Sequence, residues 1–94
     1  MEENQEQIRR IKRYERVMRE ANRILALEDV SDDLQAKLQK LLQKLDAYYR
    51  SETWKQDFAD DEAGLLPKNL KRGVLSEDGL YNLLENYDPT NSYQ

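Results

Sequence analysis

The densest set of potentially reactive groups is an acidic run formed by Asp57, Asp60, Asp61 and Glu62. Asp57 and Asp61 are four residues apart, so they would share one face of a helix. Carboxylate oxygens suit Mg²⁺ or Ca²⁺, but this spacing is not that of a calcium-binding loop. The run also falls near the C-terminal end of an expected helix, where the helix dipole disfavours negative charge. We therefore predict pairing with internal cations and no metal site. The candidate partners are Lys68, Lys71, Arg72 and the basic residues near the N-terminus.

A basic stripe runs along the N-terminal segment at steps of four, three and four residues: Lys12, Arg16, Arg19 and Arg23. Residues 8–23 hold seven basic and two acidic side chains, which gives a local charge of +5. A cationic helix face can bind phosphates or an anionic membrane surface. However, no aromatic side chain interrupts the stripe to stack on bases, and the formal net charge of the whole chain is −4. We expect a solvated face, or one that docks on the acidic segment 51–62, and keep anion binding as the alternative.

Five aromatic side chains could converge where the second expected helix leads into the third: Tyr48, Tyr49, Trp54, Phe58 and Tyr81. In one interpretation they are ordinary core with hydroxyl groups at its edge. In the other they bind a partner, because tyrosine, tryptophan and arginine dominate binding hot spots. Together with Lys71 and Arg72, these aromatic residues are the candidate interaction site.

Catalysis is difficult to build from this composition, because the chain has no cysteine and no histidine. Disulfides, thiolate nucleophiles and zinc–thiolate sites are excluded, and so is the usual general base. The four serines fall in helix-capping or tail positions. We predict that the protein is not an enzyme, with no catalytic residue and no cofactor.

The acidic start Met1-Glu2-Glu3 is unlike a secretion signal, and no apolar run approaches the roughly 20 residues of a membrane span, so we expect a cytoplasmic location.

Apolar residues at steps of three and four indicate the helices that must position these groups. The first expected helix covers residues 5–27, and the second covers 32–50 after a break in which Ser31 can act as N-cap. Their short link predicts an antiparallel hairpin. Further expected elements are a helix at 52–63, a short helical turn at 67–72, a helix at 77–86 and a disordered tail at 87–94.

The segment after residue 50 should fold back and close one core over the hairpin, giving a single all-α domain over residues 1–86. It supplies Trp54, Phe58, Leu65, Leu66, Leu70, Val74, Leu75, Leu80, Leu83 and Leu84. Because the apolar stripes of the two long helices are wide enough for more than one neighbour, two hairpins could also pack as a symmetric homodimer.

Residues 46–86, a little under half of the chain, carry a recognisable pattern. It reads Asp46-x-Tyr48-Tyr49-x-Ser51-x-x-Trp54-x-x-Asp57-Phe58-x-x-Asp61-Glu62-x-Gly64-x-Leu66-Pro67, then Leu70-Lys71-Arg72-Gly73-Val74-Leu75-Ser76-Glu77-Asp78-Gly79-x-Tyr81-x-Leu83-Leu84. This pattern resembles a family of small bacterial proteins described only as a domain of unknown function. The resemblance implies a bacterial, cytosolic, helical protein and carries over no activity, cofactor or catalytic residue. From all of these observations we predict a non-catalytic protein-interaction or structural module whose partner is a protein rather than a nucleic acid.

Overall fold

The computed structural model describes residues 2–88, with side chains from residue 5 onward, and these residues form an all-α fold. The elements are α1 (Glu2–Leu25), α2 (Asp32–Tyr49), α3 (Glu52–Glu62), the short 3-10 helix η1 (Gly73–Leu75) and α4 (Glu77–Leu84). No strand occurs among the described residues. The helical fold class predicted from the apolar periodicity is therefore confirmed.

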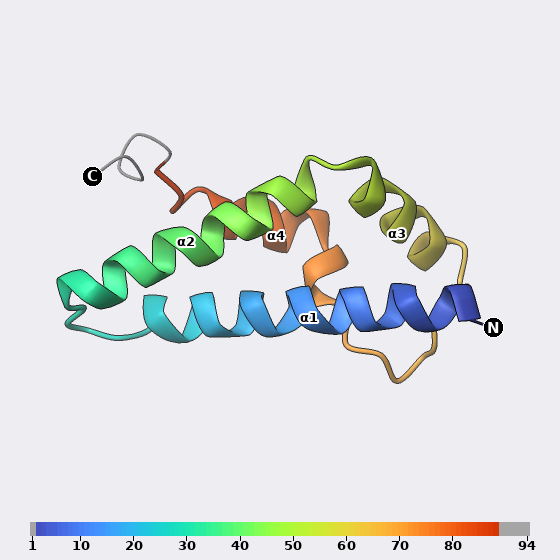
Figure 1. The fold of residues 1–94 in the computed structure, drawn as a ribbon, viewed down its shortest axis with the longest axis horizontal. Coiled ribbons are helices and arrows are strands. Elements are labelled where there is room, and N and C mark those ends of the chain that lie inside the picture. The colour runs from blue at the N-terminus through green and yellow to red at the C-terminus, as the bar shows by residue number, and fades with distance from the viewer. Residues whose placement is uncertain (1, 89–94) are drawn as a thin grey trace.

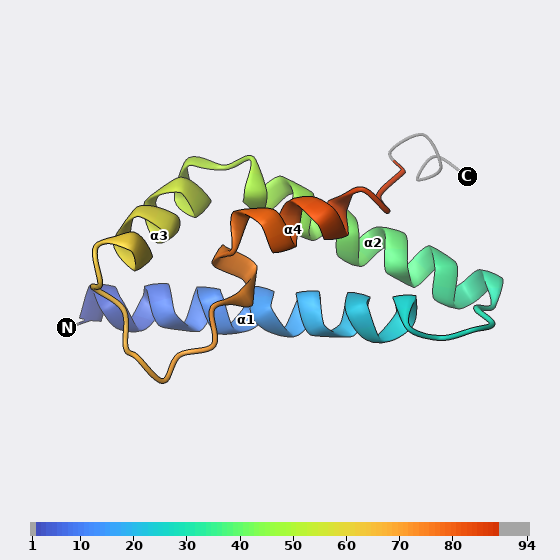
Figure 2. The same cartoon turned by 180° about the vertical axis from the view of Figure 1, so that it is seen from behind.

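The two long helices form an antiparallel hairpin, and the rest of the chain closes it (Figure 1). α3 continues from the end of α2 toward the start of α1, and α4 packs along α2. η1 lies between α4 and the middle of α1, as the reverse view shows (Figure 2). The molecule is elongated, with principal extents of 43 × 23 × 23 Å. No helix in this part of the chain is long and apolar enough to cross a membrane.

Serine side chains begin three of the helices. Ser31, Ser51 and Ser76 each accept a hydrogen bond from the backbone N–H three residues further on. This bond satisfies a donor that has no partner within the helix, and such a cap contributes about 1 kcal/mol. The three caps fix where the chain turns between α1 and α2, between α2 and α3, and between η1 and α4.

Several boundaries differ from the prediction. α1 spans Glu2–Leu25 rather than 5–27. In the segment 67–72, where a short helical turn was expected, the carbonyl of Pro67 accepts from both the Leu70 N–H and the Arg72 guanidinium, so the chain closes a single turn and regular helical geometry resumes only at Gly73. Disorder was expected from residue 87, but Tyr87 is half-buried against the core. The rest of that expected tail, 89–94, lies outside the described residues.

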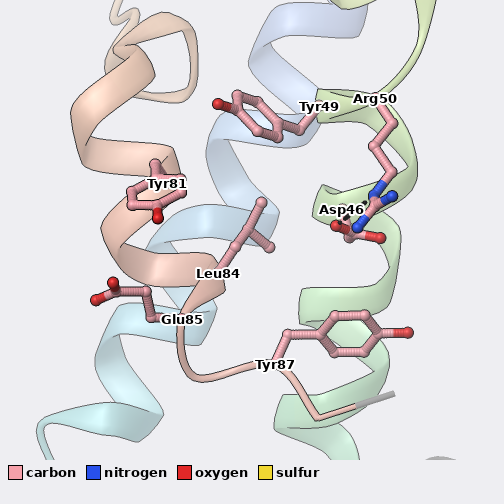
Figure 3. A pocket seen from close by; sticks show the side chains of 7 residues that line it. All are labelled: Asp46, Tyr49, Arg50, Tyr81, Leu84, Glu85 and Tyr87. Atoms are coloured by element: carbon pink, nitrogen blue, oxygen red, sulfur yellow. Dashed lines mark hydrogen bonds and ion pairs between the residues drawn. The ribbon is translucent and has the colours of Figure 1, made fainter.

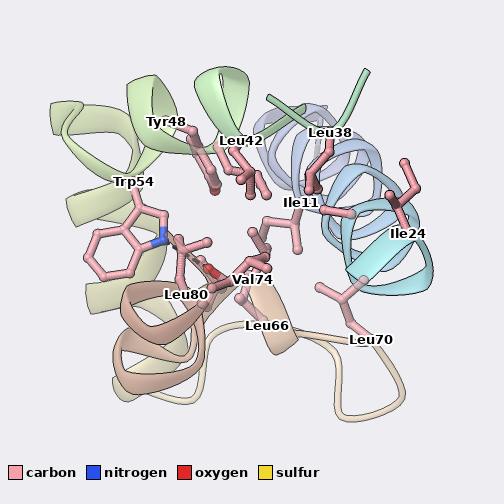
Figure 4. Packing of buried hydrophobic residues seen from close by; sticks show 14 residues of the cluster. Ile11, Ile24, Leu38, Leu42, Tyr48, Trp54, Leu66, Leu70, Val74 and Leu80 are labelled. Carbon is pink, nitrogen blue, oxygen red and sulfur yellow. Dashed lines mark hydrogen bonds between the residues drawn. The ribbon is translucent and has the colours of Figure 1, made fainter. Parts of the chain in front are cut away.

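The core fills the space between the hairpin and the C-terminal segment (Figure 4). Its buried side chains are Ile11, Ala21, Ile24, Leu38, Leu42, Leu45, Tyr48, Trp54, Leu66, Leu70, Val74, Leu75, Leu80 and Leu83. The prediction was wrong for Leu65, which is 61% exposed. Its neighbour Leu66 is the residue of the pair that enters the core.

Candidate functional site

The most ordered polar site is a buried hydrogen-bond network around Asp57, which is fully buried. Its carboxylate accepts hydrogen bonds from Gln7 Nε2 at 3.0 Å and from the Tyr48 hydroxyl at 2.5 Å. Arg10 donates two more, at 3.0 Å from Nε and 2.7 Å from Nη2. The donors come from α1 and α2, and the acceptor comes from α3. We call these four residues the Asp57 network.

The electrostatics of this network follow from burial and from its hydrogen bonds. Burial alone raises the pKa of Asp57, but the hydrogen bonds from Arg10, Tyr48 and Gln7 outweigh it, so the pKa lies below its ordinary value. Burial and then the hydrogen bond to the carboxylate raise the pKa of Tyr48. The hydrogen bond to Asp57 is also the main cause that raises the pKa of Arg10. Asp57 is therefore a stable carboxylate and Tyr48 a stable phenol, neither suited to move a proton near neutral pH.

The acidic run is divided among several partners. Asp57 pairs with Arg10, and Asp61 pairs with Arg72 at 3.1 Å. Asp60 accepts hydrogen bonds from the amides of Gln7 and Gln56. Lys68 and Lys71 were also expected as partners, but neither forms an ion pair with a described residue. In the described part of the chain, no group of acidic side chains is arranged to hold a metal ion.

An open groove lies between α2 and α4 (Figure 3). Its volume is about 330 Å³. It is lined by Asp46, Tyr49, Arg50, Tyr81, Leu84, Glu85 and Tyr87. Three of these residues are tyrosines, and Tyr81 is 57% exposed. We call this feature the aromatic groove.

The structure separates the predicted interaction residues. Tyr48 and Trp54 are 4% and 6% exposed, so they belong to the core and not to a contact surface. Tyr48 stacks on Tyr14 with ring centroids 4.0 Å apart. Trp54 lies between Tyr49 and half-buried Phe58, at centroid distances of 4.9 and 5.1 Å. Of the predicted aromatic set, Tyr49 and Tyr81 line the aromatic groove.

A second groove, on the other side of the molecule, brings two predicted sites together. Its volume is about 260 Å³, and its lining comes from α1 and from the segment between α3 and η1. The lining residues are Lys12, Glu15, Arg16, Arg19, Asn69, Leu70 and Lys71. We call it the basic groove. The spacing of Lys12, Arg16 and Arg19 predicted their shared face, but nothing in the sequence indicated that Lys71 lies beside them.

Two of the predicted basic residues are engaged elsewhere. Arg23 forms an ion pair with Glu20, which also pairs with Lys37 of α2. Arg72 pairs with Asp61 at the end of α3. Neither residue lines the basic groove. Arg23, a member of the predicted anion-binding set, shares the carboxylate of Glu20 with Lys37, so its charge is only partly offset, whereas Arg72, a member of the predicted interaction site, has Asp61 as its partner.

Sequence reasoning did not find the role of Gln39, a buried amide on α2. Its Nε2 donates to the carbonyl of Asn86 at 3.1 Å, and its Oε1 accepts from the Asp88 N–H at 2.9 Å. A side-chain amide that pairs with two backbone groups in this way fixes the path of the chain after α4. The one available signal was a glutamine next to Leu38 on the apolar side of α2.

The fold and its sites define a small all-α protein in which a helical hairpin is locked by a buried carboxylate and carries two surface grooves. The chain belongs to the family described as a domain of unknown function (DUF4298), whose model matches residues 3–91. The family membership suggested by residues 46–86 is thereby confirmed and extends over nearly the whole chain. Neither a curated protein nor a solved structure matches the chain.

Proposed function

We propose that this protein is a non-catalytic module that binds another protein, with the aromatic groove as its contact surface. The observation that carries the proposal is that three tyrosines and Leu84 line one open hollow of about 330 Å³. Sites of this kind combine apolar walls with a few polar groups that set orientation. Tyrosine is also enriched among the residues that contribute most binding energy.

The charges at the edge of the aromatic groove indicate what the partner presents. Asp46 accepts a hydrogen bond from Arg50 at 3.0 Å, so these two charges balance each other. Glu85, which directly follows α4, forms no ion pair with any described residue. The partner segment we infer therefore carries an apolar or aromatic anchor next to a lysine or arginine that reaches Glu85.

Several features support a binding role over a catalytic one. The sequence has neither cysteine nor histidine, and the fully buried carboxylate of Asp57 accepts four hydrogen bonds from three residues. A second copy of the chain is a less favoured partner. The apolar stripes behind the homodimer prediction are covered by the chain's own C-terminal segment, and the large exposed hydrophobic residues of the described chain are Leu25, Leu27, Leu65 and Tyr81.

Site-specific photo-crosslinking tests this proposal. A photoreactive phenylalanine analogue replaces Tyr81 in one variant and Leu65 in a matched variant, because both side chains are mostly exposed and only Tyr81 lines the groove. We expect a crosslinked adduct of defined mass in the protein's own cells from position 81 and none from position 65. Adducts of the same mass from both positions, or from neither, would contradict the proposal. A crosslink between two copies of this chain would show that the partner is a second copy and not a different protein.

A second candidate function is anion binding on α1. It is favoured by one observation, the presence of Lys71 beside Lys12, Arg16 and Arg19 in the basic groove. A nucleic acid or an anionic membrane surface would use the whole basic face of α1, whereas the groove is local.

A further inference from the structure

The segment after α3 crosses α1, as both views of the fold show (Figures 1 and 2). The basic groove lies between this segment and α1. Lys12, Arg16 and Arg19 follow each other at steps of four and three, which places them along one side of the helix. Lys71 comes from the crossing segment. Four cationic side chains therefore surround one hollow, although Lys71 is separated from the others by more than 50 positions in the sequence.

The charges of this groove are not balanced within the protein. Four cations and the single carboxylate of Glu15 line it, which gives a net charge of +3. Within the described part of the chain, none of the four cations forms an ion pair, whereas Arg10, Arg23 and Arg72 each have a carboxylate partner. Converging like charges repel each other, and a bound anion would remove that repulsion. A groove with this imbalance, in a chain of net charge −4, indicates a site for a negatively charged ligand.

Glu15 lowers the positive charge of the groove by one and also holds the groove together. Its Oε1 accepts a hydrogen bond from the Val74 N–H at 2.9 Å, so the carboxylate is held by the backbone of η1. A side-chain carbon added at Gly73 would lie 3.2 Å from the other carboxylate oxygen, which shows how closely η1 approaches. This contact keeps η1, and through it the crossing segment, against α1. Glu15 thus acts as a positioning residue for the groove.

We propose that the basic groove binds a small molecule that carries phosphate groups. Arginine and lysine are the side chains that recognise phosphate oxygens, through charge-assisted hydrogen bonds. The hollow is local, with a volume of about 260 Å³, which suits a small ligand. No aromatic side chain lines it, so it has no platform on which nucleic-acid bases could stack. This inference is independent of the protein-binding role proposed for the aromatic groove on the other side of the molecule.

A titration with inorganic pyrophosphate tests the site directly. Binding to the full chain is measured by calorimetry and by backbone amide NMR shifts, at constant ionic strength. We expect saturable binding that shifts the amides of residues 12–19 together with those of 69–71. Lys71→Gln and Arg16→Gln should each weaken the affinity about tenfold, the cost of losing one charge-assisted hydrogen bond. Both side chains are exposed, so the fold should tolerate either change.

Arg9→Gln is the matched control, because Arg9 is an exposed cation on α1 that does not line the groove. It removes the same charge and should change the affinity by less than about twofold. Equal losses in all three variants would indicate diffuse attraction to the basic face and overturn the proposal. An absence of saturable pyrophosphate binding would do the same.

Two further probes separate a small phosphate ligand from a macromolecular one. Vesicles of phosphatidylglycerol with phosphatidylcholine, and a single-stranded DNA oligonucleotide, are tested with the same variants. We expect that neither binds in a way that depends on Lys71. Lys71-dependent binding of vesicles or DNA without binding of pyrophosphate would overturn the small-molecule assignment in favour of that polyanion.

Discussion

Arg10 of α1 and Asp57 of α3 lie 47 positions apart in the chain and meet through two hydrogen bonds of 3.0 and 2.7 Å. Asp57 is fully buried, while the Arg10 side chain is 27% exposed. A carboxylate in the interior is tolerated only when its charge is paired and its lone pairs are occupied. The contact therefore holds α3 against the N-terminal half of α1, far from the loop that joins α1 to α2.

Replacement of Arg10 should destabilise the fold strongly. Arg10→Met keeps part of the aliphatic stem but leaves the carboxylate of Asp57 buried without its cation, a loss that costs about 3–5 kcal/mol. Urea unfolding followed by circular dichroism measures the change, with Arg9→Met as the matched surface control. A loss of less than about 1 kcal/mol in Arg10→Met would mean that the ion pair is not important for stability.

Stability should fall in acid partly through Asp57. Its pKa is lowered in the folded state, so its contribution is present above the ordinary pKa of 3.8 and is lost as the pH falls below that value, through the folded pKa. Asp57→Asn should be less stable at neutral pH and should show a weaker dependence on pH in this window. Hydrogen bonds from Arg23 and Lys37 lower the pKa of Glu20 to about 2. Glu20 therefore titrates in the wild type and in the variant alike.

Urea unfolding at a series of pH values compares wild type with Asp57→Asn. Because Glu20 contributes equally to both proteins, the difference between the two curves isolates Asp57. If the free energies of unfolding of the two proteins changed in parallel between neutral pH and pH 3, the pKa of Asp57 would not be lowered in the folded state.

Trp54 should prove to be a core residue. Its indole Nε1 donates to the carbonyl of Val74 at 3.0 Å, and its ring lies between two other aromatic rings. Trp54→Ala should cost about 3–5 kcal/mol, because it leaves a large cavity. Trp54→Phe keeps most of the volume and should cost about 1–3 kcal/mol through the unpaired carbonyl. Circular dichroism during urea unfolding measures both, and an effect of Trp54→Ala below about 0.5 kcal/mol would place the ring outside the core.

Gly64 should be needed for its backbone conformation and not for space. Its φ of 74° is in the left-handed region, yet a side-chain carbon placed there would meet no atom within 4 Å. Gly64→Ala should therefore cost about 1–2 kcal/mol, and Gly64→Asn should cost less because asparagine tolerates this region. Thermal unfolding of both variants separates the two explanations: equal losses would indicate steric crowding instead of backbone strain.

The local part of the fold was predictable because local chemistry determines it. Apolar residues at helical spacing indicated α1, α2, α3 and α4, and Ser31, Ser51 and Ser76 marked three of their starts. At 67–72 the structure has one hydrogen-bonded turn, closed between Pro67 and Leu70, and the glycine that ends the proline-to-glycine pattern has another role. Gly73 is required for close approach to Glu15 and begins η1, instead of following a helix end.

The candidate sites were less predictable because they depend on contacts between distant segments. The unfavourable position of the acidic run at a helix end did signal tertiary pairing, and Asp57 shares its helix face with Trp54, three residues away. The identities of Gln7, Arg10 and Tyr48 as its partners required the three-dimensional arrangement. Likewise, Lys71 joins Arg16 only because the segment after α3 crosses α1.

Tyr49 gives the molecule a built-in optical reporter. Its ring forms part of the aromatic groove and also meets the edge of Trp54, the only tryptophan in the chain. A partner that binds beside Tyr49 changes the surroundings of the Trp54 indole without contacting the indole. Intrinsic emission can therefore follow occupancy of that groove in real time with no added dye.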